Sequence, residues 1–287
     1  QHYNKEDLMK EIKKFHVLVV RSATKVTRDI IDEATKTNNL KLIVRGGVGL
    51  DNIDVEYARL KGITVRNTPN ASNTSVAELV IGHILNMARF LHNSNITMRQ
   101  GEWNKKKYQG VEIEGKTLGI IGFGRIGREV AKKANALGMK IKFYDVVGPI
   151  MNNQEYRYCD LDQLLSTSDF ISLHVPYNKG ERALIGKEEI QKMKDGTYLI
   201  NCARGGVVDE EALIAALDSG KLAGAAMDVF MEEPTPNNIL CNHDKVSVTP
   251  HIGASTKEAQ RKIGEEINNI ILEFWKGRGL NDRIETV

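Results

Sequence analysis

The sequence predicts an α/β fold built on parallel sheets, and two observations carry this prediction. Short apolar runs, typical of strands buried on both faces, alternate with helical patterns in both halves of the chain. Near the middle, the run Thr117–Ile121 leads into a glycine-rich turn, a helical pattern from Arg125 to about Leu137 and a second apolar run, Ile141–Tyr144. We therefore expect a doubly wound nucleotide-type sheet in the second half and a similar, smaller sheet in the first.

The remaining elements follow the same patterns along the chain. In the first half we expect strands over 17–21, 40–44 and 63–66, and helices over 5–14, 27–34, 52–60 and, as one long element, 73–98. In the second half we expect strands over 170–175, 197–201, 222–227 and 246–248, and helices over 161–165, 209–217 and 255–276.

The glycine-rich turn has the spacing of a dinucleotide-binding motif. Gly122 suits the tight turn, Gly124 lets a pyrophosphate approach the backbone, and Gly127 lets the helix pack closely on the strand. The N-terminus of the helix offers free N–H groups to the phosphates, and Arg125 lies beside them. Asp145 ends the next strand, where a carboxylate holds ribose hydroxyls and repels a 2′-phosphate. The motif therefore predicts an NAD site.

Composition limits the classes of function. The 287 residues include 40 basic and 37 acidic ones, so the net charge of +3 does not indicate nucleic acid or membrane as a partner. No apolar run is long enough to span a bilayer. Three scattered cysteines, Cys159, Cys202 and Cys241, fit reduced thiols in a cytoplasmic protein. No zinc spacing, hydrolase elbow or phosphate loop of the kinase type is present, and we expect no metal.

Polar residues follow several predicted strands at the edge where ligands of parallel sheets bind. In the first half these are Arg21 and Arg45, whose planar guanidinium groups suit carboxylate or phosphate, and the glycines after Arg45 expose N–H groups. In the second half, Arg204, Glu233 and His251 form a set suited to hydride transfer from a 2-hydroxy acid. Histidine would take the hydroxyl proton, arginine would hold the carboxylate, and the acid would orient the histidine.

Other candidates have simpler interpretations. His83 lies on the apolar stripe of the long helix and is expected to be a packed core histidine, and His174 is given no role. Glu232 is the alternative acid, but Glu233 precedes Pro234, which fixes the turn. The basic loop from Trp103 to Tyr108 is expected to be a solvated face, with contact to a neighbouring subunit's anionic substrate as the alternative.

Motifs along nearly the whole chain resemble the D-2-hydroxyacid dehydrogenase family, and within it most closely the D-3-phosphoglycerate dehydrogenases. The matching segments are VRSAT at 20–24, GVGLDN at 47–52, NTP at 67–69, VAEL at 76–79, the glycine motif, NCARGGVVD at 201–209, DVF at 228–230, EEP at 232–234 and PHIGASTKEAQ at 250–260. The resemblance implies an NAD domain over 71–256, inserted into a smaller flavodoxin-like substrate domain over 1–70 and 257–287 that lacks its first strand. It also implies a homodimer formed through the NAD domain.

The resemblance places the family's functional residues on this chain. The catalytic residues would be Arg204, Glu233 and His251. Cofactor contacts would come from Gly122, Gly124, Arg125, Ile126, Gly127, Asp145, Val175, Pro176, Cys202, Ala203, Arg204, Asp228, His251, Gly253 and Ala254. Substrate contacts would come from Arg21, Arg45, Gly46, Gly47, Val48, Asn70, Arg204 and His251.

The expected activity is NAD-dependent oxidation of 3-phospho-D-glycerate, the first step of L-serine biosynthesis. The alternatives are a reductase of glyoxylate, hydroxypyruvate or another 2-oxo acid, and a non-enzymatic NAD-sensing corepressor. A formate dehydrogenase is disfavoured, because that relative carries glutamine where Glu233 stands. Many relatives carry a C-terminal serine-sensing domain, for which this sequence leaves no room after Val287, so we expect no serine feedback.

Overall fold

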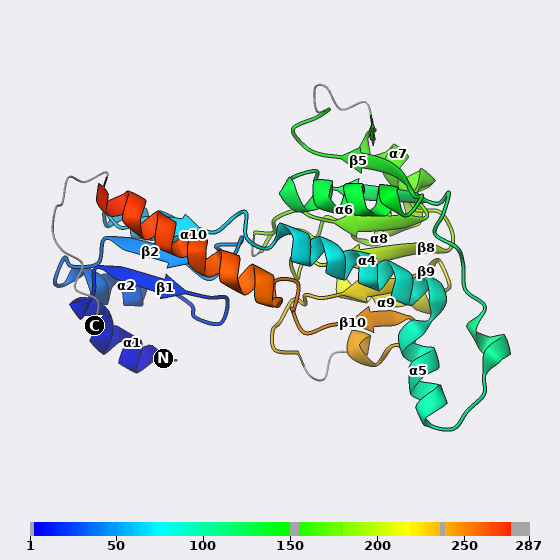
Figure 1. The fold of residues 1–287 in the computed structure, drawn as a ribbon, viewed down its shortest axis with the longest axis horizontal. Helices are drawn as coiled ribbons and strands as arrows, with labels where there is room; N and C mark the ends of the chain where they lie inside the picture. Colours follow the sequence, from blue (N-terminus) through cyan, green and yellow to red (C-terminus); the bar gives the residue numbers. More distant parts are fainter. Residues whose placement is uncertain (1–2, 150–154, 179, 236–238, 277–287) are drawn as a thin grey trace. The chain divides into compact units, whose positions relative to one another are not determined.

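The computed structural model describes residues 3–149, 155–178, 180–235 and 239–276. The chain forms two compact units: unit 1 comprises residues 1–72 and 254–287, and unit 2 comprises residues 73–253. Each unit is built on a parallel sheet with packed helices, which confirms the predicted α/β class (Figure 1). Among the described residues, no helix combines the length and apolar character needed to cross a membrane.

Unit 1 holds a three-stranded parallel sheet in the order β1-β2-β3 within its described part. Its strands are β1 (Val17–Val20), β2 (Leu42–Arg45) and β3 (Thr64–Asn67), and its helices are α1 (Lys5–Glu11), the 3₁₀ turn η1 (Ile12–Lys14), α2 (Arg28–Thr35), α3 (Val55–Leu60) and α10 (Lys257–Lys276). The first three α-helices share an apolar core with the sheet, while α10 returns from the far end of the sequence to pack on β2. The sheet thereby packs against helices from the first and the last part of the sequence.

The described residues of unit 2 form a seven-stranded parallel sheet in the order β10-β9-β8-β7-β4-β5-β6. Its strands are β4 (Thr117–Ile121), β5 (Lys140–Tyr144), β6 (Arg157–Tyr158), β7 (Phe170–Leu173), β8 (Thr197–Asn201), β9 (Leu222–Met227) and β10 (Val246–Val248). The strand order reverses direction at β4, which lies between β5 and β7. In a sheet of this kind, ligands bind beyond the carboxyl ends of the strands at that reversal.

Helices cover both faces of the unit 2 sheet. They are α4 (Asn73–Arg89), α5 (Leu91–Arg99), α6 (Arg125–Ala136), α7 (Leu161–Thr167), α8 (Lys187–Lys192) and α9 (Glu210–Asp218), with 3₁₀ turns η2 (Lys105–Tyr108) and η3 (Ile239–Asn242). One apolar core is shared by the sheet with α4 and α6, and the other by the sheet with α7, α8 and α9 (Figure 1).

The prediction of one long helix over 73–98 is wrong. The chain turns at Phe90, which adopts a left-handed conformation with φ 52° and ψ 37°, so that α4 and α5 are separate helices. The side chain of Asn86 accepts a hydrogen bond from the backbone N–H of His92 at 2.7 Å, and the Phe90 ring packs against Tyr108. These contacts stabilise the break, which a helical apolar spacing alone does not reveal.

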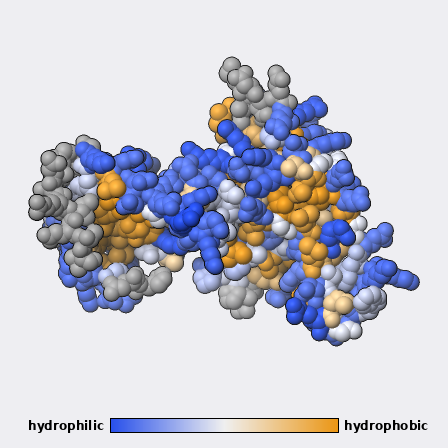
Figure 2. All heavy atoms as spheres, in the orientation of Figure 1, coloured by the Kyte–Doolittle hydropathy of each residue, from blue (hydrophilic) through white to orange (hydrophobic). Residues whose placement is uncertain are grey.

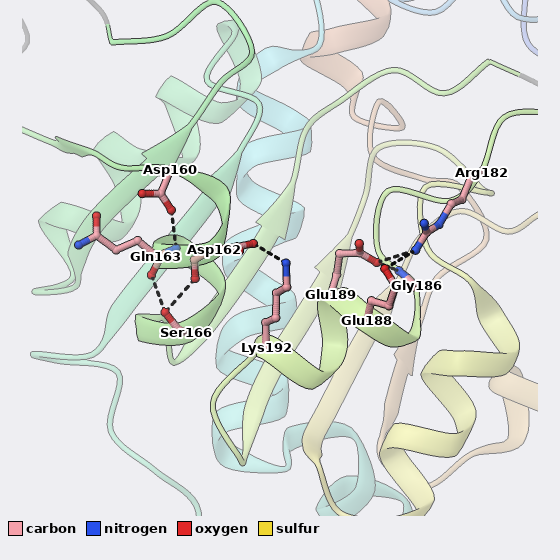
Figure 3. Close-up of polar contacts among 9 residues, drawn as sticks. All are labelled: Asp160, Asp162, Gln163, Ser166, Arg182, Gly186, Glu188, Glu189 and Lys192. Carbon is pink, nitrogen blue, oxygen red and sulfur yellow. Dashed lines mark hydrogen bonds and ion pairs between the residues drawn. The ribbon is translucent and has the colours of Figure 1, made fainter.

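Helix α8 is an addition to the predicted elements. Its sequence, KEEIQK, contains one buried residue, Ile190, and therefore gives no periodic signal. Local polar contacts stabilise it instead, as Figure 3 shows. The Gly186 N–H donates to Glu189 Oε2 at 2.9 Å, and Lys192 pairs with Asp162 of α7 at 2.7 Å.

Candidate active site

The glycine motif forms a tight turn between β4 and α6. Gly122 has φ 91°, and a Cβ there would lie 2.5 Å from the carbonyl oxygen of His174. A Cβ on Gly127 would lie 2.3 Å from the Gly122 carbonyl oxygen, so α6 packs on β4 as closely as a glycine allows. By contrast, a Cβ on Gly124 would meet nothing within 4 Å. The backbone is therefore constrained by protein at the first and third glycines and faces open space at the second.

Asp145 lies directly after β5, at the same sheet edge as the glycine turn. Its Oδ2 accepts a hydrogen bond from the N–H of Phe123 at 2.7 Å, which ties the carboxylate to the turn. Its Oδ1 accepts from the N–H of Val147 at 3.0 Å. Because each carboxylate oxygen has two acceptor positions, both oxygens keep capacity for ribose hydroxyls. An open backbone at Gly124 and a carboxylate fixed beside it fit a dinucleotide such as NAD.

The predicted catalytic side chains, together with Asp228 from the predicted cofactor contacts, follow three neighbouring strands of unit 2. Arg204 follows β8, Asp228 and Glu233 follow β9, and His251 follows β10. Because the three strands are parallel neighbours, their carboxyl ends lie at one edge of the sheet. Residues separated by up to 47 positions in the sequence are thereby gathered at the edge that also carries the glycine turn.

His251 and Glu233 are hydrogen-bonded, with Nδ1 of the ring 2.7 Å from Oε2 of the carboxylate. The other oxygen, Oε1, accepts from the backbone N–H of Phe230 at 3.1 Å. Since an ionised carboxylate only accepts, the proton of a neutral His251 ring lies on Nδ1 and the lone pair on Nε2. This is the tautomer that a proton acceptor at Nε2 requires.

Opposing effects act on the pKa of Glu233. Burial raises it, but the hydrogen bond and charge of His251, the Phe230 N–H and the charge of Arg204 outweigh burial, so the pKa lies below its usual value. Glu233 is therefore ionised at neutral pH. Because the charge of Arg204 acts on this carboxylate, Arg204, Glu233 and His251 lie close enough to interact electrostatically. A cation and an imidazole so placed suit proton abstraction beside a bound carboxylate.

The other cofactor residues expected from the resemblance lie around the same edge. Val175 and Pro176 follow β7, and Cys202 and Ala203 follow β8. Burial raises the pKa of the Cys202 thiol well above its usual value, so this cysteine remains protonated. In unit 2, the N–H of Gly253 donates to Asp228 Oδ2 at 3.0 Å. Asp228 thus fixes the backbone after His251.

In unit 1, the residues predicted to bind substrate lie at or shortly after the carboxyl ends of β1, β2 and β3. The guanidinium of Arg45 folds over Gly47, where a Cβ would overlap it, and Gly47 has φ 139°. A Cβ on Gly46 would lie 3.1 Å from the side chain of Ile263, so the glycine lets α10 approach. Asn70 donates to Glu266 of α10 at 3.1 Å. Val48 follows this turn and is partly buried.

Arg21 follows β1, beside the strand that leads into this turn, and lines a surface hollow of unit 1. It shares the hollow with Ser255, Thr256, Lys257 and Gln260, and its guanidinium donates to the Gln260 side chain. Two cations and two hydroxyl groups beside the first turn of a 20-residue helix form an environment suited to an anion. Lys257 and Gln260 were not among the predicted site residues. Both lie in the segment 250–260 that resembles the family, as the first and fourth residues of α10, and this was the signal that could have found them.

Comparison with known proteins identifies the class. Residues 81–253 match the family described as "D-isomer specific 2-hydroxyacid dehydrogenase, NAD binding domain". A hydroxypyruvate reductase of Thermotoga maritima is 54% identical over 270 residues, covering 93% of this chain and 87% of the relative. A D-3-phosphoglycerate dehydrogenase of Methanocaldococcus jannaschii is 48% identical over 276 residues, covering 95% of this chain and 52% of the relative. This chain thus spans about half the length of that relative.

A solved structure agrees with this class. The structure of D-lactate dehydrogenase from Aquifex aeolicus complexed with NAD and lactic acid has a TM-score of 0.83 and 37% identity, covering 94% of this chain and 85% of that one. The matched family is one of NAD-linked dehydrogenases. The chain belongs to the D-isomer specific 2-hydroxyacid dehydrogenase family, and the predicted family and cofactor are confirmed.

Proposed function

We propose that this chain oxidises 3-phospho-D-glycerate to 3-phosphohydroxypyruvate with NAD, as the first step of L-serine biosynthesis. The observation that carries the proposal is the hydrogen bond between His251 Nδ1 and Glu233 Oε2 at 2.7 Å, in the unit that holds the NAD motif. It leaves Nε2 as the proton acceptor. NAD, when bound, supplies the hydride acceptor for the reaction.

The residues of unit 2 divide the remaining work. His251 Nε2 takes the proton of the substrate hydroxyl as the carbon loses hydride, and Glu233 stabilises the imidazolium that forms. Arg204 binds the carboxylate and the oxygen that becomes a carbonyl. In the reverse direction the same imidazolium returns the proton. The proton that leaves the substrate hydroxyl is thus carried by the His251 ring.

The hollow of unit 1 supports a phosphorylated substrate. Arg21 and Lys257 supply positive charge there, and Ser255 and Thr256 supply hydroxyl donors. We propose that Arg21 contributes to capture of the substrate phosphate, while Arg45 contributes to binding its carboxylate end. A substrate without the phosphate leaves this basic group unused. The expected exposure of the glycine N–H groups is not found at Gly46 and Gly47, which donate to the Val20 carbonyl at 2.8 Å and to Thr68 Oγ1 at 2.7 Å.

A second candidate is reduction of hydroxypyruvate or glyoxylate. The Thermotoga maritima relative named as a hydroxypyruvate reductase supports it, since it is similar over 87% of its own length. Both candidates use the same His251 and Arg204 chemistry and differ in the group distant from the reacting carbon. Arg21 is therefore the residue that distinguishes them.

The test is a substrate panel read by NADH absorbance. We expect the highest kcat/KM with 3-phosphoglycerate, and we expect Arg21→Gln to lower that value about tenfold or more while changing the value for glycerate by less than about threefold. Hydroxypyruvate as the best substrate, with no effect of Arg21→Gln, would favour the second candidate. NAD binding without turnover of any hydroxy acid would favour the corepressor alternative.

We also propose that the protein acts as a homodimer formed through unit 2. Figure 2 shows apolar side chains gathered on the face of unit 2 where α4 and α6 lie. Further apolar side chains are exposed on α5 and the segment after it: Leu91, Ile96, Met98 and Trp103. Apolar surface of this extent favours association. Light scattering should give twice the chain mass of 32.1 kDa, whereas a concentration-independent monomer would refute the dimer.

A further inference from the structure

A chain of hydrogen bonds inside unit 2 connects α4 to the segment that carries His251. The amide of Asn86 donates to Ser247 Oγ at 2.7 Å, and Ser247 Oγ lies 2.8 Å from His83 Nδ1. On the other side of the ring, His83 Nε2 lies 3.1 Å from Thr249 Oγ1, which donates to Asp228 Oδ1 at 2.6 Å. His83 is 4% exposed and Asp228 is 1% exposed.

The protonation of His83 sets the direction of this chain. Burial lowers the pKa of His83, against the opposing charge of Asp228, so the ring is neutral at pH 7 and carries one N–H. Ser247 already accepts from Asn86 and can donate its own proton to Nδ1. The ring proton then lies on Nε2 and is donated to Thr249. Every donor in the chain therefore points towards the Asp228 carboxylate.

Asp228 accepts hydrogen bonds from the backbone of His251 and of the two residues that follow it. Its carbonyl oxygen accepts from the His251 N–H at 2.8 Å, its Oδ1 accepts from Ile252 N–H at 2.9 Å, and its Oδ2 accepts from Gly253 N–H at 3.0 Å. His251 itself has φ 54°, a conformation that non-glycine residues adopt only when their surroundings impose it. The orientation of the imidazole therefore depends on Asp228 remaining fixed.

We propose that His83 is a positioning residue, which orients Thr249 and Asp228 and thereby holds the His251 ring in line with Glu233. This inference rests on the proposed role of His251 as proton acceptor. It assigns a function to a residue on α4 whose ring nitrogens are hydrogen-bonded to Ser247 and Thr249 and not to His251 itself. A histidine that merely fills the core would stabilise the fold without affecting the His251 ring.

The test compares two substitutions of His83. His83→Leu removes both nitrogen atoms, whereas His83→Gln keeps an acceptor and a donor side by side on one planar group. We expect kcat to fall about tenfold or more in His83→Leu and to stay within about threefold in His83→Gln, with the dissociation constant of NADH nearly unchanged in both. Met87→Ala is the matched control, because Met87 is buried one turn further along α4 and takes no part in the chain. It should lower the melting temperature and leave kcat unchanged.

A double-mutant cycle with Thr249→Val tests the route. If His83 acts through Thr249, the double variant should be no slower than Thr249→Val alone, because the link is already broken. Independent, multiplicative losses of kcat in the double variant would overturn the inference. So would a His83→Leu protein with the kcat of the unmodified chain.

A readout independent of turnover separates this inference from the proposed function. The seven histidines can be labelled and their ring signals compared by NMR at one pH in the unmodified protein and in the variants. We expect the His251 ring signals to move in His83→Leu, since a displaced ring bonds Glu233 less well, and to stay in place in Met87→Ala. If the unmodified protein turns over no hydroxy acid, the proposed function fails, and an unmoved His251 signal would still refute the positioning role.

Discussion

Replacing Glu233 with glutamine tests the hydrogen bond on which the proposed chemistry depends. The carboxylate accepts from two donors at once, His251 Nδ1 and the Phe230 N–H. Glutamine has only one oxygen, so it can serve only one of them in the same way. Either its oxygen faces Phe230 and its NH₂ group faces the ring, or the reverse.

Both orientations are unfavourable for catalysis. With the NH₂ group against Nδ1, the ring must accept there, and its proton moves to Nε2, the atom that should take the substrate proton. With the oxygen against the ring, the Phe230 N–H lies against an NH₂ group and loses its acceptor, which costs about 1–3 kcal/mol. The active orientation is therefore disfavoured about 5- to 150-fold. Loss of the negative charge, worth about 1 kcal/mol for a half-exposed pair, reduces the rate further.

The expected result for Glu233→Gln is a fall in kcat of about 30- to 800-fold, measured as NADH production at saturating NAD and hydroxy acid. The affinity for NADH, measured by fluorescence, should change less than about threefold, since the glycine turn and Asp145 are untouched. Glu232→Gln is the matched control, because the adjacent acid should contribute nothing. A Glu233→Gln protein with kcat within threefold of the unmodified chain would refute the assigned tautomer and the role of His251 derived from it.

Three further predictions concern the cofactor site and acid stability. Asp145→Asn should reduce the preference for NAD over NADP about tenfold or more, because the charge that repels a 2′-phosphate is lost; an unchanged ratio of kcat/KM values would contradict this. Gly127→Ala should lower the free energy of unfolding by about 2 kcal/mol or more, because its Cβ meets the Gly122 carbonyl. Gly124→Ala should keep the stability of the fold and weaken NADH binding. Denaturant titration measures the first effect, and NADH fluorescence measures the second. Burial lowers the pKa of His174 to about 4. The unfolded chain therefore binds a proton at this histidine below about pH 6.5, whereas the folded chain binds it only near pH 4, so the free energy of unfolding falls as the pH is lowered from 6.5 to 4. Since His174 keeps some exposure, we expect about 1–2 kcal/mol of this loss to be absent in His174→Gln, as measured by urea titration; equal losses in both proteins would contradict it.

The parallel sheets could be predicted because each element carries its own local signal. Strands β8, β9 and β10 are short apolar runs whose bounds match those expected from the sequence. Helix α8 has one buried residue and no periodicity, and the break at Phe90 depends on the side chain of Asn86, which reaches the N–H of His92. Such elements are set by contacts that composition does not record.

The same distinction applies to the candidate site. Arg204, Glu233 and His251 could be predicted together because each follows a strand, and parallel strands place their carboxyl ends at one edge. The distance between His251 and Glu233 could not be predicted, because it depends on how the chain turns after β9 and β10.

The role proposed for His83 shows what lies beyond sequence patterns. Its spacing on α4 indicated a core histidine, and the residue is indeed buried. Its hydrogen bonds, however, join Ser247 and Thr249, which flank the last residue of β10 and are more than 160 positions away. Helical spacing indicates which face of α4 is buried, but it does not indicate which polar groups of other elements pack against that face. A buried polar side chain must find partners, and in this unit those partners lead to Asp228 and the backbone of His251. On this proposal, the stability of the core and the orientation of the proposed proton acceptor depend on the same hydrogen bonds.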